Sequence, residues 1–295
     1  MTMHYGLHIP NFGPYGDVHV LAELAHEAEE AGWNGFFLWD QVAKTTLTPS
    51  IDPMVDPWIA LATIALRTNN IRLGTLITPL PRRRPWNVAR ETVSLDHLSG
   101  GRLVFGAGLG GGYYDFSALG EASDLKTLAG MLDEGLQVLT GLWSGKPFHF
   151  EGMYYHIREA QFLPHPVQTP RIPIWVAATW PLKSPLRRAV HWDGVFPQGR
   201  DLPLTSMLSP QEVEALMHFL KEQPGYTPSI EIVHGGISTG QDASRDADLV
   251  ASYARVGITW WIEKIVPERW GSWTEWPLEA MRERIRLGPP GLVRQ

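Results

Sequence analysis

The sequence has no cysteine among its 295 residues, which excludes a disulfide-stabilised scaffold, a thiolate metal site and a cysteine nucleophile. It also lacks an excess of positive charge, because 25 Lys and Arg stand against 31 Asp and Glu, for a formal net charge of −6. A nucleic-acid-binding protein usually carries a basic face, so that class is disfavoured. No run of about 18 apolar residues is present either, so we expect no membrane span.

The N-terminal residues MTMHYGLHIP contain neither the basic region nor the long apolar region of a signal peptide. Hydrophobic residues make up 44% and charged residues 19%, which is typical of globular proteins and not of disordered chains. The histidines show no metal-ligand spacing, because His4 and His8 share a strand face but would lie about 13 Å apart. We therefore expect a soluble, cytoplasmic protein without a metal site.

What the sequence does have is an alternation of short β-rich runs and helical stretches. The runs cover residues 5–9, 36–39, 71–77, 102–107, 172–178, 194–196, 230–234 and 258–266. Five predicted helix starts share an N-cap residue or a proline in the first turn and lie at Asp17, Asp56-Pro57, Pro85, Ser184-Pro185 and Ser209-Pro210. Further helices are expected over 125–143, 243–256 and 277–286.

Eight strand–helix units in a chain of this length predict an α/β fold, namely a closed (β/α)₈ TIM barrel formed as one domain over residues 1–295. Residues 146–170 break the rhythm and predict a small hairpin with an extended Pro-rich connection, inserted between helix four and strand five. The competing architecture is a doubly wound open sheet. It usually has fewer units and needs a phosphate-binding fingerprint after its first strand, where this chain has PNFGPYG.

Two motif matches are better interpreted as loops. Residues 106–111 match G-x-G-x-x-G after a strand, but no helix opens directly after them, as a dinucleotide site requires. A Gly-rich loop at the top of a barrel strand fits better. Residues 236–240 match G-x-S-x-G, but the hydrolase triad needs a histidine after Ser238, and the last histidine is His234.

The C-terminal ends of barrel strands are where active sites of this fold form. Trp39 and Trp180 lie at two such ends and would give an aromatic wall for a flat apolar ligand such as a flavin ring. His8 lies nearer that end than His4, so it either contacts substrate or is a buried core histidine. Residues 82–84, three consecutive arginines, are either solvated loop charges or a positive rim that attracts an anionic cofactor.

The exit of the fifth run is a further candidate. Thr179 to Ser184 lead into a helix whose N-terminus offers free N–H groups, so this exit is a plausible phosphate seat. Ser184-Pro185 is equally consistent with an ordinary N-cap and first-turn pair.

Ordered blocks along almost the whole chain resemble the bacterial luciferase-like family of flavin- and deazaflavin-dependent oxidoreductases. They cover residues 6–10 (GLHIP), 28–32 (AEEAG), 36–40 (FFLWD), 56–58 (DPW), 71–75 (IRLGT), 95–103 (LDHLSGGRL), 132–136 (LDEGL) and 188–195 (RAVHWDGV). The resemblance implies a flavin ring across the barrel mouth above strand three, with a non-proline cis peptide between Leu76 and Ile77. It also implies a homodimer.

The cofactor-binding residues that follow are Trp39, Leu76, Ile77, Thr78, Gly108, Leu109, Ala178, Thr179, Trp180 and Ser184. The catalytic candidates are His8 and Gln41. Gln41 stands where many relatives place a histidine after strand two, and Gln cannot shuttle a proton as His can. Leu109 stands where some relatives use an arginine for phosphate.

The function that we expect is monooxygenation of a small organic substrate by reduced FMN and oxygen, with a separate flavin reductase as a further partner. The first alternative is hydride transfer with the 8-hydroxy-5-deazaflavin coenzyme, and the second is a non-catalytic flavin-binding protein. The deazaflavin coenzyme has a long anionic tail, for which Lys183, Arg187 and Arg188 lie beside the predicted phosphate seat. A net charge of −6 gives a polyanion no general attraction, so FMN is favoured.

Overall fold

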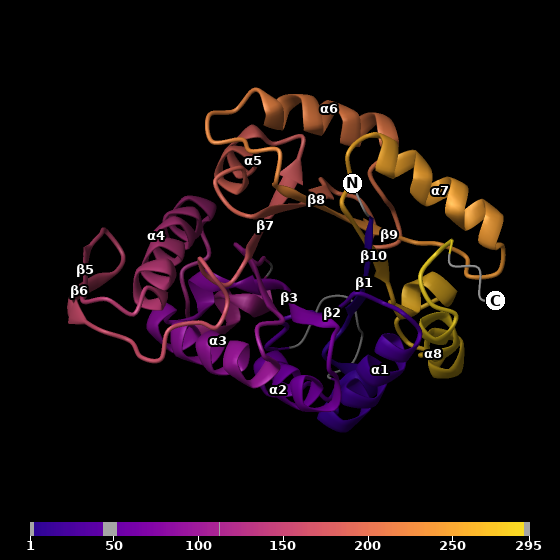
Figure 1. Cartoon of the computed structure of the whole chain (residues 1–295), viewed down its shortest axis with the longest axis horizontal. Helices are drawn as coiled ribbons and strands as arrows, with labels where there is room; N and C mark the ends of the chain where they lie inside the picture. Colours follow the sequence, from indigo (N-terminus) through magenta and orange to yellow (C-terminus); the bar gives the residue numbers. More distant parts are fainter. Residues whose placement is uncertain (1–2, 44–51, 112, 292–295) are drawn as a thin grey trace.

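Parallel strands close into a barrel surrounded by helices, in a computed structural model that describes residues 3–43, 52–111 and 113–291 (Figure 1). The strands follow each other around the barrel in the order β1-β10-β9-β8-β7-β4-β3-β2. This is the (β/α)₈ architecture that the alternating pattern predicts. Among the described residues, no helix is both long and apolar enough to cross a membrane.

The strands of the barrel are β1 (His4–Ile9), β2 (Gly35–Leu38), β3 (Arg72–Pro79), β4 (Leu103–Gly108), β7 (Ile174–Trp180), β8 (Gly194–Gly199), β9 (Glu231–Gly236) and β10 (Trp260–Lys264). The helices are α1 (Val18–Glu30), α2 (Pro57–Arg67), α3 (Pro85–Ser99), α4 (Leu125–Trp143), α5 (Lys183–Ala189), α6 (Pro210–Lys221), α7 (Ala243–Arg255) and α8 (Leu278–Arg286).

Capping residues start the helices much as the sequence predicts. The Asp17 carboxylate accepts a hydrogen bond from the His19 N–H at the start of α1. At α6, Ser209 and Glu212 form a reciprocal capping box. Ser184, in contrast, is not an N-cap. Helix α5 begins at Lys183, its N-cap is Leu182, and no side chain caps it.

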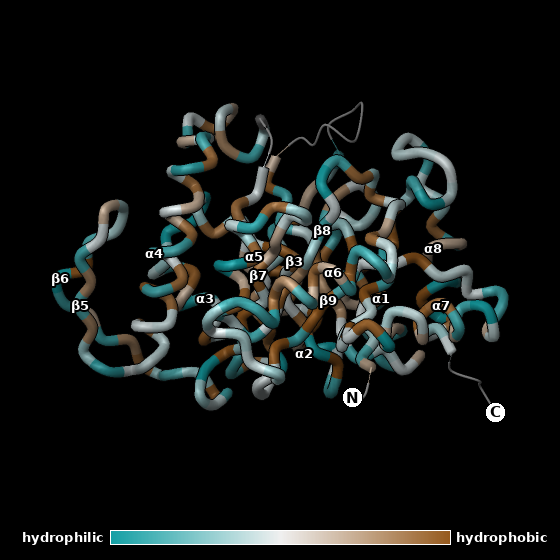
Figure 2. Tube along the Cα trace, turned by 90° about the horizontal axis from the view of Figure 1, so that it is seen from above, coloured by the Kyte–Doolittle hydropathy of each residue, from teal (hydrophilic) through white to brown (hydrophobic). Residues whose placement is uncertain are grey.

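The predicted hairpin is present as the antiparallel strands β5 (Phe148–Glu151) and β6 (His156–Ala160). It lies outside the barrel, beyond α4, in both views of the chain (Figure 1 and Figure 2). Its turn is fixed by the Glu134 carboxylate of α4, which accepts backbone hydrogen bonds from Met153, Tyr154 and Tyr155.

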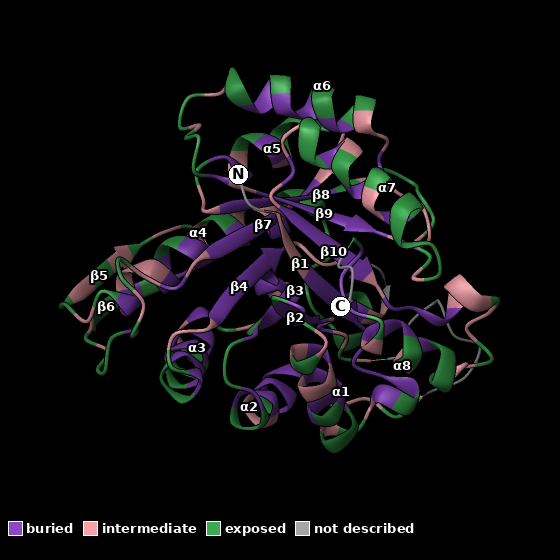
Figure 3. Cartoon of the chain, turned by 45° about the vertical axis from the view of Figure 1, so that its right-hand side comes forward, coloured by how far each residue is buried: buried purple, intermediate pink, exposed green. Residues whose placement is uncertain are grey.

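Both faces of the barrel strands are buried, one against the helices and the other inside the barrel. The barrel strands are buried, and each helix has a buried inner and an exposed outer side (Figure 3). Large side chains fill the barrel interior, which is a packed core rather than a pore. They are Phe37, Leu76, Val104, Trp175, Phe196, Val233, Trp260 and Ile262.

Candidate active site at the barrel mouth

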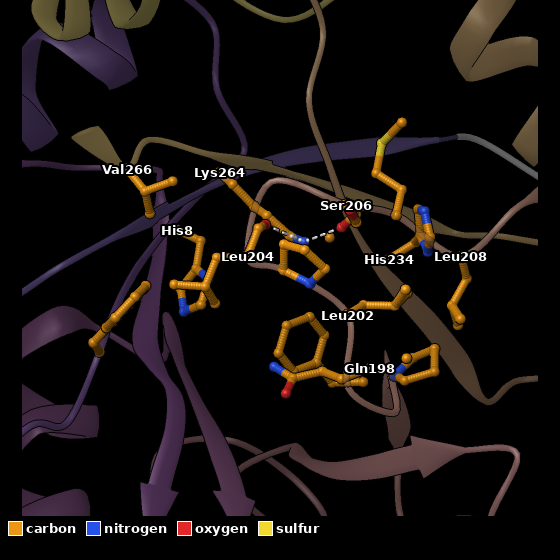
Figure 4. Close-up of a pocket in the computed structure, with 16 residues that line it drawn as sticks. His8, Gln198, Leu202, Leu204, Ser206, Leu208, His234, Lys264 and Val266 are labelled. Atoms are coloured by element: carbon orange, nitrogen blue, oxygen red, sulfur yellow. Dashed lines mark hydrogen bonds between the residues drawn. The ribbon is translucent and has the colours of Figure 1, made fainter. Parts of the chain in front are cut away.

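A pocket opens at the C-terminal ends of β1, β8, β9 and β10, where barrel enzymes carry their active sites. Its empty volume is about 590 Å³, counting the space that is open to solvent. The side chains that matter for its chemistry are those of His8, Trp39, Phe196, Leu202, His234 and Lys264. None of the lining residues is an Asp or a Glu. The segment 202–208, which follows β8, supplies one wall (Figure 4).

His8 is buried at the end of β1 and has a defined proton arrangement. Its Nε2 lies 2.5 Å from the carbonyl oxygen of Leu76. Since a carbonyl can only accept, Nε2 carries a hydrogen and Nδ1 is left as an acceptor. Burial, helped by the Lys264 charge, lowers the pKa of His8 to about 3, although the bond to Leu76 opposes this shift. His8 is therefore a neutral imidazole near pH 7.

Lys264, the last residue of β10, reaches across the pocket to the 202–208 segment. Its ammonium donates hydrogen bonds to the backbone oxygens of Leu204 and Ser206, at 2.9 and 2.8 Å (Figure 4). Burial lowers the pKa of this ammonium to about 8, while the charge of Glu268 acts in the opposite direction. No carboxylate of the described residues forms an ion pair with Lys264.

His234 and Trp39 complete the polar surface of the pocket. Both ring nitrogens of His234 are buried without a hydrogen-bond partner, and so is the Trp39 indole nitrogen. Burial and the Lys264 charge lower the pKa of His234 to about 3. Its ring stacks on Tyr253 with 4.5 Å between the centroids, so the ring orientation is fixed by packing.

Strand β3 carries the feature that the family resemblance implies. The peptide bond between Leu76 and Ile77 is cis, and the pairing of β3 with β4 shifts register between Thr75 and Thr78. Gly108 of β4 leaves the room that Ile77 needs, because a Cβ at position 108 would lie 2.7 Å from its Cδ1. The half-buried Ile77 therefore sits in a fixed position beside the mouth.

Arg82 and Arg83 are neither solvated nor a free positive rim, in contrast to both sequence interpretations, whereas Arg84 is exposed as the solvated interpretation expects. Arg82 binds Asp40 at 2.6 Å and Asp115 at 2.8 Å, and Arg83 binds Asp40 at 3.0 Å. Asp40 also accepts a 2.8 Å hydrogen bond from the Thr78 hydroxyl. These groups bind each other, so the fully buried Thr78 belongs to the framework beside the site and does not line the pocket.

The exit of β7 lies beside the pocket of Figure 4 rather than in it. The hydroxyls of Thr179 and Ser184 form no hydrogen bond to another described residue, so both could hold a phosphate. Lys183 lies over the Phe219 ring at 4.0 Å and over the Trp180 ring at 5.4 Å. Ala178 is buried in the strand.

The cations expected near this exit differ in availability. Arg188 is paired with Asp133 at 2.5 Å and is not free for an anionic tail. Arg187 is exposed and contacts Gln223 at 3.3 Å.

The last two predicted positions occupy loops. Gln41 is half-buried, and its backbone is held on both sides by the Asn11 amide, at 2.9 and 3.2 Å. Leu109 packs against the main hydrophobic core. Neither residue lines the pocket of Figure 4.

Sequence reasoning missed Lys264, His234 and Phe196 as site residues. Each lies at or near the C-terminal end of a predicted strand, and this position is the signal that could have found them.

The residues at the mouth fit a flavin-type cofactor. The unpartnered indole nitrogen of Trp39 would meet the polar edge of such a ring, and Trp39 and Phe196 offer apolar surface. A flat ring with a polar edge needs this combination. The phosphate would be held by Thr179 and Ser184.

The sequence matches the family described as luciferase-like monooxygenase over residues 3–211, and the chain belongs to this family. A similar protein is the F420-dependent hydroxymycolic acid dehydrogenase of Mycobacterium tuberculosis, which is 31% identical over 193 residues (64% of this chain and 51% of that protein). Another is the oxygenase component of the flavin-dependent trigonelline monooxygenase of Acinetobacter baylyi. It is 27% identical over 202 residues (68% and 52%).

The alignments with the curated relatives thus span about half of each relative's length. Among solved structures, an F420-dependent secondary alcohol dehydrogenase in complex with an F420–acetone adduct superimposes with a TM-score of 0.74. The match has 15% identity and covers 90% of this chain and 94% of that one. At this identity the likeness concerns the fold alone.

Proposed function

We propose that the protein is an oxidoreductase that transfers a hydride between a small organic substrate and F420, the 8-hydroxy-5-deazaflavin coenzyme, at the barrel mouth. The observation that carries this proposal is His8. It is neutral, its tautomer is fixed by the Leu76 carbonyl, and its Nδ1 has no partner among the described residues.

Oxidation of an alcohol removes a hydride and a proton, and the two must leave in different directions. The bound coenzyme supplies the hydride chemistry. The protein must hold the hydroxyl and receive its proton, which requires an acceptor that is unprotonated near pH 7. His8 Nδ1 meets this requirement, because burial and the Lys264 charge keep the ring neutral. In the reverse direction, Nδ1 would have to carry that proton and return it to the carbonyl oxygen as the hydride arrives at carbon.

The choice of coenzyme is supported by the relatives. The dehydrogenases of Microbacterium testaceum, Mycobacterium tuberculosis and Gordonia bronchialis that resemble this chain are named as F420-dependent. The exposed Lys183 and Arg187 lie where the anionic tail of that coenzyme would leave the phosphate seat.

The second candidate is an FMN-dependent monooxygenase, the function favoured by the sequence. The observation that favours it is the ion pair between Arg188 and Asp133, which removes one of three cations that a long anionic tail would use. Such an enzyme would need a partner that supplies reduced FMN, a separate flavin reductase.

Absorbance titration of the protein with F420 and, separately, with FMN tests the cofactor. The proposal expects tight F420 binding that weakens with salt, and reduction of the bound coenzyme by a member of a panel of small alcohols. Preferential binding of FMN and oxygen-dependent turnover would instead support the monooxygenase. Binding without any turnover would support a carrier.

His8→Phe tests the proton acceptor. We expect turnover to fall by a factor of about 100 or more with coenzyme affinity unchanged, the usual contribution of a positioned acid or base. His4→Phe is the matched control, because His4 shares the strand but stacks on Trp260 at the opposite end of the barrel. Equal turnover of the two variants would refute the role of His8.

A further inference from the structure

The mouth contains a half-buried cation that forms no ion pair with a carboxylate of the described residues. Lys264 lines the pocket, and its two hydrogen bonds go to the uncharged backbone oxygens of Leu204 and Ser206. A buried ammonium is usually paired with a carboxylate, because burial of an isolated charge is unfavourable. Arg82 follows this rule through Asp40, and Arg269 follows it through Glu263. Arg102 is a half-buried cation that, like Lys264, donates to neutral oxygens, but it lies away from the pocket.

Unused hydrogen-bond donors lie around Lys264. An ammonium has three N–H groups, of which two are used. The Trp39 indole N–H has no partner, and each neutral imidazole carries one N–H, which His234 does not use. No Asp or Glu lines the pocket to accept these bonds. The pocket therefore offers a positive charge and hydrogen-bond donors, and no carboxylate lines it.

We propose that the substrate of this enzyme carries a carboxylate and that Lys264 binds it, with the N–H group of His234 beside it. This inference rests on the proposed function in taking the barrel mouth as the substrate site, and it names the substrate class. The anion provides the counterion that Lys264 lacks. With the carboxylate on Lys264, Nδ1 of His8 stays available to accept a hydrogen bond from a hydroxyl group of the same substrate.

The 202–208 segment has a defined part in this arrangement. The oxygens of Leu204 and Ser206 hold two of the three N–H groups of Lys264, so they position the ammonium without neutralising it. Gly235 leaves room for the Lys264 stem, since a Cβ there would lie 2.7 Å from its Cε. The side chain is thus fixed over the pocket rather than directed into solvent.

Benzoate and its neutral isostere benzamide test the proposal on the protein without any cofactor. Ligand-observed NMR measures both affinities near pH 7. We expect benzoate to bind about tenfold more tightly, because hydrogen bonds to a charged group exceed neutral ones by about one factor of ten in affinity. Lys264→Met should abolish this preference. Lys221→Met, on the outer end of α6, is the control with the same change in net charge and should keep it.

A second measurement does not depend on how well the variants fold. In the wild-type protein, benzoate should shift the imidazole NMR signals of His8 and His234 and leave that of the exposed His218 in place. Equal affinity for the two probes, no benzoate binding, or a preference that survives in a folded Lys264→Met variant would overturn the proposal. Because no cofactor is present, these outcomes are independent of the F420 and FMN titrations.

Discussion

Glu263 of β10 is a fully buried carboxylate. Its replacement by Gln tests how much its contacts contribute to the stability of the fold. Its oxygens accept hydrogen bonds from the Ser238 backbone and hydroxyl, at 2.9 and 3.0 Å, and from the Trp261 indole, at 2.9 Å. Arg269 binds it at 2.6 Å, and Arg284 of α8 lies 3.4 Å away. The carboxylate thus joins β10, the loop after β9 and the last helix.

Glu263→Gln keeps the shape of the side chain but removes its charge. One oxygen becomes an NH₂ group that faces donors, and two buried guanidinium groups lose their counterion. Breaking a buried ion pair by neutralising one partner costs about 3–5 kcal/mol. At about 2.1 cal/mol/K of unfolding entropy per residue, a chain of this length should lose about 5–8 °C of melting temperature.

Thermal unfolding followed by circular dichroism measures this loss. Glu159→Gln, an exposed acid of the hairpin strand β6, is the matched control and should change stability by no more than about 0.5 kcal/mol. If the two variants melt together, the Glu263 cluster does not contribute to stability as its geometry indicates.

Two further predictions concern packing and charge. A Cβ at Gly74 would overlap the Val104 carbonyl oxygen of the neighbouring strand, so Gly74→Ala should destabilise the fold by about 1–3 kcal/mol or more. Gly111→Ala is the control, because a Cβ there meets open space and should be neutral. Urea unfolding of both variants measures the difference. The folded-state pKa values of His8 and His234, about 3, lie below the unfolded value of about 6.5, so only the unfolded chain gains these protons and stability must fall between about pH 6.5 and 3. Each histidine should contribute a loss of about 2 kcal/mol at pH 5, and a His234→Phe variant whose acid sensitivity equals that of the wild type would contradict this assignment.

The fold could be predicted from the sequence because each strand–helix unit carries its own local signals. Asp56 and Ser209 cap their helices through contacts within three residues, so a short window of sequence contains the whole cause. The exception is α5, where Leu182 rather than Ser184 is the N-cap. A proline is tolerated throughout the first turn, because N–H groups there have no intrahelical partner, so Pro185 did not fix the start to one residue.

The mouth could be predicted only in part, because its chemistry depends on pairs that are distant in sequence. Arg82 stands between Asp40 and Asp115, which are 42 and 33 residues away, and no local pattern signals this pairing. Lys264 lies on a predicted strand, but its partners belong to the 202–208 segment, which carries no motif. His8 could be predicted as a pocket residue because its position near the C-terminal end of a strand is visible in the sequence.

His8 and Lys264 are electrostatically coupled, which gives the two proposals a joint consequence. Burial is the first cause of the low pKa of His8, and the Lys264 charge adds to it. A carboxylate bound to Lys264 would cancel that second cause and raise the pKa of His8, so the imidazole becomes a better proton acceptor when the substrate is in place. Titration of the His8 imidazole NMR signal should therefore show an upward shift with saturating benzoate and none with benzamide. An unchanged pKa with benzoate bound would mean that the anion does not lie against Lys264.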